Sequence, residues 1–192
     1  DSLNYTKKLS LKCILRGGGE MKKLGIWGLI LGVSLALLNL GLAQEKKFYV
    51  YSDRVSAENH YAPSGWIGDY GDLKLDDQNM ESPYSGSSCI KIVYTAQKSN
   101  NKGWAGIYWQ SPPNNWGYQP GGFDLTGFNK LVFYARGEKG GEVITIAKVG
   151  GIGINQEVPY PDSSQAEIGP FKLTKEWQPY YINLVDEDLS YI

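Results

Sequence analysis

Aromatic residues set among glycines are the part of this sequence best suited to contact a ligand. They occur in residues 65–71 (GWIGDYG) and 103–110 (GWAGIYWQ), and the Asn/Pro-rich residues 111–118 (SPPNNWGY) add more. Tryptophan and tyrosine present large flat apolar rings with a polar edge. Rings of this kind among small residues predict a surface on which another flat apolar face can rest.

The order of residues in 104–110 indicates which rings share a face. Alternate side chains of a strand point to the same side, so Trp104 and Tyr108 flank Gly106 on one face. The opposite face carries Trp109 between apolar neighbours, which suits contact with a core. We therefore expect an open aromatic shelf on one side of this segment and a structural role for Trp109.

Sugars are ligands that fit such a shelf, because a sugar ring has a flat apolar face and a rim of hydroxyl groups that amides and carboxylates can bind. The expected stacking residues are Trp66, Tyr70, Trp104, Tyr108 and Trp116. The expected hydroxyl contacts are Asp69, Asn114, Asn115 and Arg136. The alternative for any of these rings is a structural role in the core or in a strand. We expect such a role for Trp177, which looks like a plug at the entry to a strand.

Nucleophilic and transition-metal chemistry have little support. The 192 residues include one His and two Cys, too few for a typical transition-metal site. His60 has no Ser or Cys beside it in a nucleophile motif, so we expect a turn or surface residue. Lys and Arg (19) balance Asp and Glu (20), which leaves no basic surplus for a nucleic-acid partner.

Asp69 and Asp72 support a competing hypothesis. A glycoside hydrolase or lyase needs only two suitably separated carboxyl groups, and the sequence does not give their separation. Acidic residues in Gly-rich loops are also common turn formers. This alternative predicts an enzyme, whereas the aromatic segments predict a binding protein without a catalytic residue.

Residues 21–43 are organised like a signal peptide. Met21 is followed by two lysines, by an uncharged run at 24–42 and by small residues before Gln44, as a signal peptidase site requires. The alternative is an uncleaved membrane anchor, because the run is long enough to span a bilayer. We expect cleavage after Ala43 and a secreted or periplasmic product without membrane contact.

Residues 1–20 are expected to be a translated leader that is disordered and lies outside the domain. Residues 16–20 (RGGGE) are what a purine-rich ribosome-binding site encodes when it is translated in frame. The expected domain, residues 44–192, holds 13 basic and 18 acidic side chains and is therefore acidic. Its single cysteine, Cys89, is either a buried apolar residue or half of a disulfide whose other cysteine lies outside the given sequence.

The pattern of residues 44–192 is typical of an all-β domain. Short segments rich in β-branched and aromatic residues alternate with Gly, Pro, Asn and Asp clusters, and no window keeps a helical apolar period. The expected strands are 48–52, 72–75, 88–96, 104–110, 130–136, 142–149, 166–173 and 177–184. Their alternation predicts antiparallel sheets in a β-sandwich or jelly roll. Residues 188–192 (DLSYI) read as the start of another strand, so we expect a domain truncated at its C-terminus.

Three segments resemble galactose-binding-like jelly rolls, a group that includes many bacterial carbohydrate-binding modules. Residues 123–137 (FDLTGFNKLVFYARG) look like the turn and following strand of that group. Residues 84–92 (YSGSSCIKI) resemble its loop-to-strand step, and residues 173–184 resemble its late tryptophan-led strand. The resemblance implies a jelly-roll fold, and members of the group bind sugars in loops, on the concave sheet face, or not at all.

The same resemblance implies a metal. Many of these modules hold a structural calcium ion, for which carboxylates are suitable ligands. The residues that could supply part of such a site are Asp53, Asp76, Asp77 and Glu81.

The residues and the resemblance together predict an exported, non-catalytic module that binds a glycan or polysaccharide by aromatic stacking. A hydrolase or lyase that uses loop carboxylates and a structural domain of a surface assembly are the alternatives.

Overall fold

The computed structural model describes residues 7–17 and 46–192, and these residues form an all-β structure. The first six strands are β1 (Lys7–Gly17), β2 (Lys47–Tyr51), β3 (Ala62–Gly68), β4 (Leu73–Asn79), β5 (Cys89–Tyr94) and β6 (Ala105–Gln110). The others are β7 (Phe128–Gly137), β8 (Val143–Ile144), β9 (Ala147–Gly150), β10 (Gln165–Ile168), β11 (Phe171–Lys172) and β12 (Gln178–Asn183). A short 3-10 turn, η1 (Tyr70–Asp72), joins β3 to β4. Every pairing among these strands is antiparallel, which confirms the all-β, antiparallel part of the expected fold.

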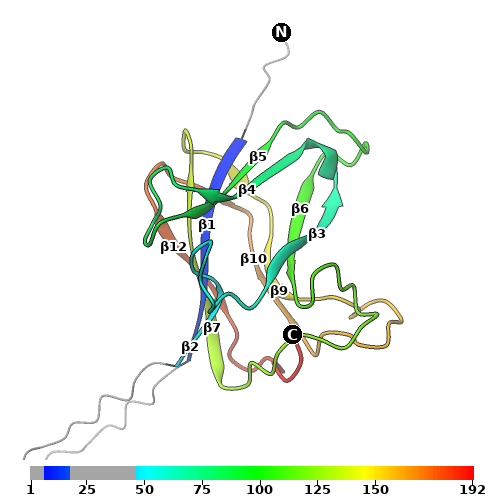
Figure 1. Ribbon diagram of the computed structural model, residues 1–192. Coiled ribbons are helices and arrows are strands. Elements are labelled where there is room, and N and C mark those ends of the chain that lie inside the picture. The colour runs from blue at the N-terminus through cyan, green and yellow to red at the C-terminus, as the bar shows by residue number, and fades with distance from the viewer. Residues whose placement is uncertain (1–6, 18–45) are drawn as a thin grey trace, which may run out of the picture.

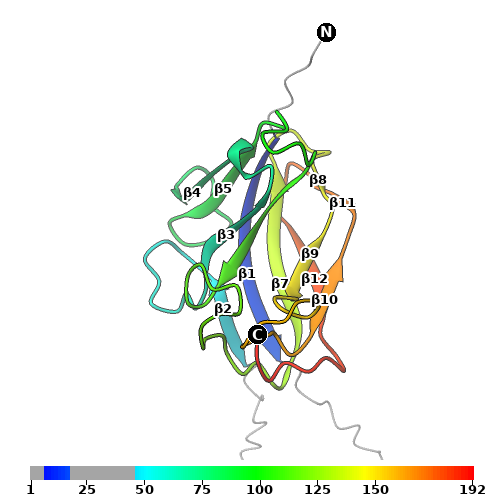
Figure 2. The same ribbon diagram turned by 90° about the vertical axis from the view of Figure 1, so that its right-hand side faces the viewer.

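The strands are arranged in two layers. One large sheet has the order β12-β7-β1-β5-β4, with β2 also paired to β1. Three two-stranded ladders, β3–β6, β9–β10 and β8–β11, complete the structure. The β3–β6 and β9–β10 ladders lie on the same side of the large sheet (Figures 1 and 2), so the arrangement is sandwich-like.

The hydrophobic core lies against one face of β7 and β12. Leu131, Phe133 and Ala135 alternate along β7 and are all buried, and Ile182 of β12 is paired with Leu131. The ring of Tyr180 stacks on Phe133 with centroids 5.5 Å apart. Leu125, Phe128, Val149, Leu173, Leu184 and Leu189 complete the buried cluster. This period-two burial is what half-buried antiparallel strands require.

β1 differs from the expectation that residues 1–20 are a disordered leader. It lies between β5 and β7, where Leu11 is aligned with both Ile90 and Ala135. The sequence of residues 9–15 (LSLKCIL) has apolar residues at every second position, the pattern that favours a strand in a half-buried sheet. The RGGGE segment alone favours a leader, whereas the alternation at residues 9–15 favours a strand.

The remaining N-terminal predictions concern residues that the structure does not describe. The expected signal peptide at 21–43 lies entirely outside the described residues. Where the structure does describe the chain, it contains no helix with the length and apolar character needed to cross a bilayer. Whether residues 1–20 belong to the translated protein stays a prediction.

Most of the expected strands occur, with different ends. The strand expected at 142–149 is divided into β8 and β9, and the one expected at 166–173 is divided into β10 and β11. β3 was not predicted as a strand because Pro63 and its glycines are unfavourable in a sheet interior. It is tolerated because β3 lies at the edge of a two-stranded ladder, where a missing N–H can face away from the partner.

Candidate functional site

The β3–β6 ladder carries two of the predicted aromatic residues, Trp66 and Tyr108, and places them on opposite faces. Gly65 is paired with Tyr108, and Trp66 is paired with Ile107. Directly opposed residues of an antiparallel pair lie on the same face, and consecutive residues lie on opposite faces. Trp66 and Tyr108 therefore project from opposite faces, so the structure does not join Trp66 to the predicted shelf.

Trp104 lies immediately before β6 and its side chain is 51 % exposed. Its ring rests on Gly68, because a Cβ atom added to Gly68 would lie 2.8 Å from Cε3 of the ring and 2.3 Å from the Trp104 carbonyl oxygen. Gly68 has a φ angle of +69°, which glycine adopts without steric cost. One side of the ring thus packs on backbone, while about half of the side chain remains open to solvent.

Asp69 organises the loop that leads to Trp104. Its carboxylate accepts hydrogen bonds from the backbone N–H groups of Asn100 (2.8 Å), Lys102 (2.9 Å) and Gly103 (2.6 Å). Its own N–H donates to the Trp104 carbonyl at 2.7 Å. Burial acts to raise the pKa of Asp69, but the three backbone hydrogen bonds together lower it by more. The pKa of Asp69 therefore lies below its ordinary value. Asp69 is 0 % exposed, and it is therefore a positioning residue instead of the expected hydroxyl contact.

Asp72 is used in the same way. It is 3 % exposed, and its Oδ2 accepts the backbone N–H of Lys98 at 2.7 Å. A general acid or nucleophile must reach the substrate, whereas the carboxylates of Asp69 and Asp72 are buried and bonded to their own loop. The geometry gives no support to the hydrolase or lyase alternative.

A second loop holds Trp116 beside Tyr108, with ring centroids 5.5 Å apart in an edge-to-face contact. The loop is ordered by Asn115, whose Oδ1 accepts the N–H groups of Gly117, Tyr118 and Gln119 at 3.1–3.2 Å. Asn115 is buried, so it positions the loop and is not placed to bind sugar hydroxyls as expected.

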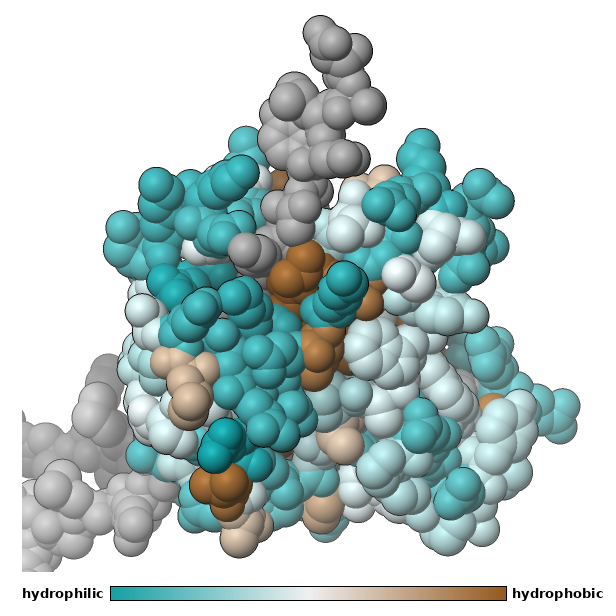
Figure 3. Space-filling model, turned by 45° about the horizontal axis from the view of Figure 1, so that its top comes forward, coloured by the Kyte–Doolittle hydropathy of each residue, from teal (hydrophilic) through white to brown (hydrophobic). Residues whose placement is uncertain are grey.

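We call Trp104, Tyr108 and Trp116 the aromatic surface. Gly106 and Tyr108 share a face of β6, and a Cβ added to Gly106 would lie 3.9 Å from Cζ3 of the Trp104 ring. Trp116 contacts Tyr108. Figure 3 shows many pale residues of intermediate hydropathy on the side of the molecule where β3 and β6 lie in Figure 1, next to a brown hydrophobic patch near the centre of the view.

The other predicted contacts have different positions. Tyr70 is exposed on η1. It directly follows Asp69, whose backbone N–H bonds to the Trp104 carbonyl. Asn114 is exposed in the second loop and its N–H donates to Ser64 Oγ at 2.9 Å. Arg136 lies on β7 in the large sheet, with its guanidinium 5.4 Å from the centre of the Trp177 ring. Arg136 therefore belongs to a different cluster from the aromatic surface.

Trp177, for which a structural role at a strand entry was expected, is half-buried and directly precedes β12. Its Nε1 donates to the Ser82 carbonyl at 3.0 Å, and its ring meets Tyr84 edge to face. Tyr84 in turn stacks on Tyr134 at 3.8 Å. The ring therefore closes a surface cluster and does not enter the core.

The expected calcium ligands are not gathered into a site. Asp53 accepts hydrogen bonds from Ser87 and Ser88, which lower its pKa to about 2. Glu81 forms an ion pair with Lys91 at 2.8 Å, and Asp76 accepts the N–H of Gln78. Across residues 7–17 and 46–192, no cluster of three or more His, Cys, Asp or Glu side chains could hold a metal ion.

His60 and Cys89 have structural surroundings. The His60 ring stacks on Phe48 at 3.9 Å, and its Nδ1 is 2.8 Å from the Tyr49 carbonyl oxygen. Cys89 is a free, buried thiol whose Sγ accepts Asn79 Nδ2 at 3.2 Å. Within residues 46–192, Cys89 is thus a buried apolar side chain, which is one of its two expected roles.

Sequence reasoning missed one positioning residue and one exposed ring. Gln110 is buried and links Ser64 of β3 (2.9 Å) to the carbonyl of Asn115 (2.7 Å). Tyr118, two residues after Trp116, is 67 % exposed. The position of Gln110 between a strand and a proline-rich loop was the available signal, because a polar residue there can satisfy loop backbone groups.

The fold and the site define an all-β antiparallel protein with an exposed, loop-supported aromatic surface. No family model, curated protein or solved structure significantly matches this chain.

Proposed function

We propose that this protein is an exported, non-catalytic carbohydrate-binding module that holds polysaccharide chains against the aromatic surface. In this proposal the sandwich-like structure is a galactose-binding-like jelly roll, and the signal peptide at residues 21–43 directs export. Cleavage after Ala43 would separate β1 from β5 and β7, so the exported module would lack that strand. Trp104 and Trp116 stack on sugar rings, with Tyr108 between them in the binding surface.

The observation that carries the proposal is the way Trp104 is presented. Its ring packs on Gly68 from one side, its loop is fixed by three hydrogen bonds to Asp69, and it is 51 % exposed. An aromatic ring that is ordered before binding loses little conformational entropy when a ligand stacks on it. The buried carboxylate of Asp69 orders the loop that leads to the exposed Trp104, and this arrangement supports a binding role for Trp104.

The same contacts favour binding over catalysis. Both Asp69 and Asp72 have their oxygens directed to backbone N–H groups of residues 98–103. The aromatic surface supplies ring faces, and its neighbours Asn114 and Tyr118 supply exposed polar groups. This combination suits a neutral ligand with a flat apolar face and peripheral hydroxyl groups.

Affinity electrophoresis tests the proposal. The purified full chain is run in native gels that contain one of a panel of soluble polysaccharides with different backbone sugars, and in a gel without polysaccharide. We expect at least one polysaccharide to retard the protein relative to a non-binding reference protein. Absence of retardation by every polysaccharide would reject carbohydrate binding and favour a structural role in a surface assembly.

A parallel assay separates binding from turnover. Incubation of the chain with the retarding polysaccharide should release no new reducing ends or unsaturated products. Release of such products, abolished by Asp69→Asn or Asp72→Asn in a folded variant, would show that the protein is an enzyme.

A further inference from the structure

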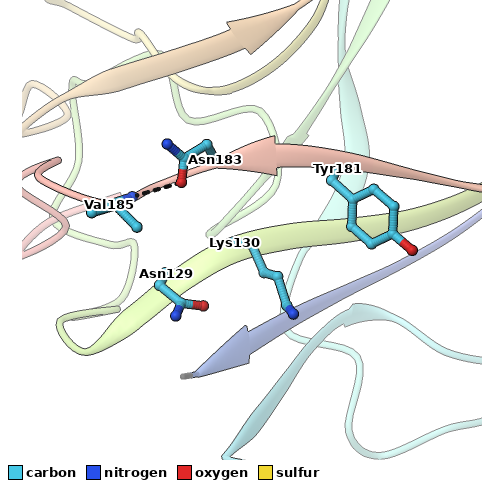
Figure 4. Close-up of a pocket in the computed structure, with 5 residues that line it drawn as sticks. All are labelled: Asn129, Lys130, Tyr181, Asn183 and Val185. Atoms are coloured by element: carbon cyan, nitrogen blue, oxygen red, sulfur yellow. Dashed lines mark hydrogen bonds between the residues drawn. The ribbon is translucent and has the colours of Figure 1, made fainter. Parts of the chain in front are cut away.

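A shallow depression of about 300 Å³ lies on the large sheet, over β7 and β12. It is lined by Asn129, Lys130, Tyr181, Asn183 and Val185. Figure 4 shows Lys130 and the Tyr181 ring on neighbouring strands, with Asn129 and Asn183 toward one end of the depression. Its volume is at the lower limit of small-molecule sites, which span about 300–1,000 Å³.

Strand register places these groups together. Asn183 is paired with Lys130, and Tyr181 is paired with Val132. Tyr181 and Asn183 are two residues apart and share a face, and Tyr181 is diagonal to Lys130, a separation that aromatic and long side chains can bridge. Two rigid strands therefore hold the ring, the ammonium group and the amide in a fixed relation.

The depression offers unused hydrogen-bonding groups. The side-chain oxygen of Asn129, which lines the depression, is buried and has no hydrogen-bond partner. This is unfavourable, and a ligand donor reaches the oxygen only when the Asn129 side chain turns toward the depression. Asn183 uses its Oδ1 to accept the N–H of Val185 at 3.3 Å, so its amide NH₂ remains available as a donor. The Tyr181 side chain is 53 % exposed and presents a ring to solvent.

Lys130 adds a positive charge to this group. The ion pairs among residues 46–192 are formed by Lys91 with Glu81 and by Lys148 with Glu167, and Lys130 takes no part in them. A lysine ammonium is a compact charge that binds carboxylates. The depression thus combines an aromatic face, amide groups of both polarities and an uncompensated cation.

We infer that this depression is a second binding site, specific for an acidic sugar residue such as a uronic acid. The sugar ring lies on Tyr181, its carboxylate pairs with Lys130, and its hydroxyls bond to Asn129 and Asn183. The site is built on β7 and β12 and shares no residue with the aromatic surface, which is built on β3, β6 and their loops. It therefore goes beyond the proposed function, and either site can fail without the other.

Two matched ligands test the inference. One is a uronic-acid trisaccharide, and the other is the neutral trisaccharide in which each carboxyl group has been reduced to a hydroxymethyl group. Calorimetric titration of the full chain at low salt should give an affinity for the acidic ligand about three- to tenfold higher than for the neutral one. The difference should shrink as salt is added, because exposed charge pairs are screened.

Variants locate the site. Lys130→Met should remove the preference for the acidic ligand, and Tyr181→Ala should weaken binding of that ligand in a protein with an unchanged unfolding midpoint. Trp104→Ala, at the other site, should leave the preference intact. Lys130→Gln is the second variant if Lys130→Met does not fold.

Three results would overturn the inference: equal affinity for the two ligands, an acidic preference that survives Lys130→Met and Lys130→Gln, or a preference lost with Trp104→Ala. The last result would assign the acidic sugar to the aromatic surface and would leave the proposed function standing. A preference lost with Lys130→Met while polysaccharide retardation fails would instead support this site alone.

Discussion

Asp69 and Trp104 are joined through the backbone: the N–H of Asp69 donates to the Trp104 carbonyl at 2.7 Å, while the Asp69 carboxylate holds the preceding loop. The most buried acidic side chain near the aromatic surface thus supports its most important ring. Asp69, which was expected to contact the ligand, is therefore the support of Trp104, the residue proposed to do so.

Replacing Asp69 tests that support. Asp69→Asn keeps the size of the side chain but exchanges one acceptor oxygen for an NH₂ group. Either the Gly103 N–H or the N–H groups of Asn100 and Lys102 then lose their acceptor. We expect faster amide hydrogen exchange in residues 100–103, a lower unfolding midpoint and weaker polysaccharide retardation. Asp77→Asn, at an exposed position of β4, is the charge-matched control and should change none of these. Unchanged exchange in Asp69→Asn would contradict the role assigned to Asp69.

Gly68 is predicted to be irreplaceable for two separate reasons. Its φ angle is +69°, and an added Cβ would meet the Trp104 carbonyl oxygen and ring. Gly127 is the matched control, because its φ angle is +88° but nothing lies within 4 Å of an added Cβ. Gly127→Ala should cost about 1–2 kcal/mol for the backbone conformation, and Gly68→Ala should cost about 1–3 kcal/mol more for the overlap. Equal losses in denaturant unfolding would show that Trp104 does not rest on Gly68.

Because of Asp162, the free energy of unfolding should decrease as the pH rises from 4 to 6. Burial raises the pKa of Asp162 to about 6, against an opposing hydrogen bond from the Ile152 N–H, whereas the ordinary value is 3.8. Between these values the folded protein binds more protons than the unfolded chain, so the free energy of unfolding decreases as the pH rises. Asp162→Asn should flatten this part of the profile and gain stability relative to the wild type as the pH rises. A pH-independent difference between the two proteins would contradict it.

Asp53 should act in the opposite sense at lower pH. Hydrogen bonds from Ser87 and Ser88 lower the pKa of Asp53 to about 2. Its stabilising contribution is therefore complete above the unfolded pKa of about 4 and is lost as the pH falls toward 2. Denaturation profiles of Asp53→Asn and the wild type should converge at low pH. Divergence on acidification would show that these hydrogen bonds do not favour the ionised form.

β1 gives a direct test of the N-terminal assignment. In the unprocessed full chain, with its mass verified, Leu11→Pro removes a backbone N–H from a strand that pairs on both sides, and should lower the free energy of unfolding by about 2 kcal/mol or more. Leu11→Val keeps strand propensity and serves as the control. An unchanged unfolding midpoint in Leu11→Pro would show that residues 7–17 lie outside the fold, as the leader prediction holds.

Strand positions were largely predictable because burial on one face imposes a two-residue period. That period located β7 and β12, where Phe133 and Ile182 lie in the core. It did not locate β3, since the edge position that tolerates Pro63 is a property of pairing and is absent from local sequence. Likewise, the breaks between β8 and β9 depend on which ladder each short strand joins.

The exposure of the site's aromatic rings could be predicted from the sequence, but the contacts of its polar side chains could not. Trp104 is exposed, in agreement with its small neighbours, whereas a ligand surface shared by Trp104 and Tyr108 stays a prediction. Asp69 and Asn115 were expected to bind ligand because carboxylates and amides do so, but both turn inward to backbone N–H groups. Sequence does not distinguish these uses, because the deciding factor is whether a nearby loop leaves its donors unpaired. Trp66 was misplaced for a related reason, since its face depends on the register with Ile107.

The most direct test of the central claim is the migration of Trp104→Ala in a native gel. The gel contains the polysaccharide that retards the wild type most. Loss of one stacking ring should reduce affinity about tenfold, so the variant should migrate nearly as in the gel without polysaccharide, at an unchanged unfolding midpoint. Trp177→Phe, which changes a tryptophan outside the aromatic surface, should be retarded like the wild type. Wild-type retardation of a folded Trp104→Ala variant would contradict the claim that the aromatic surface binds the glycan.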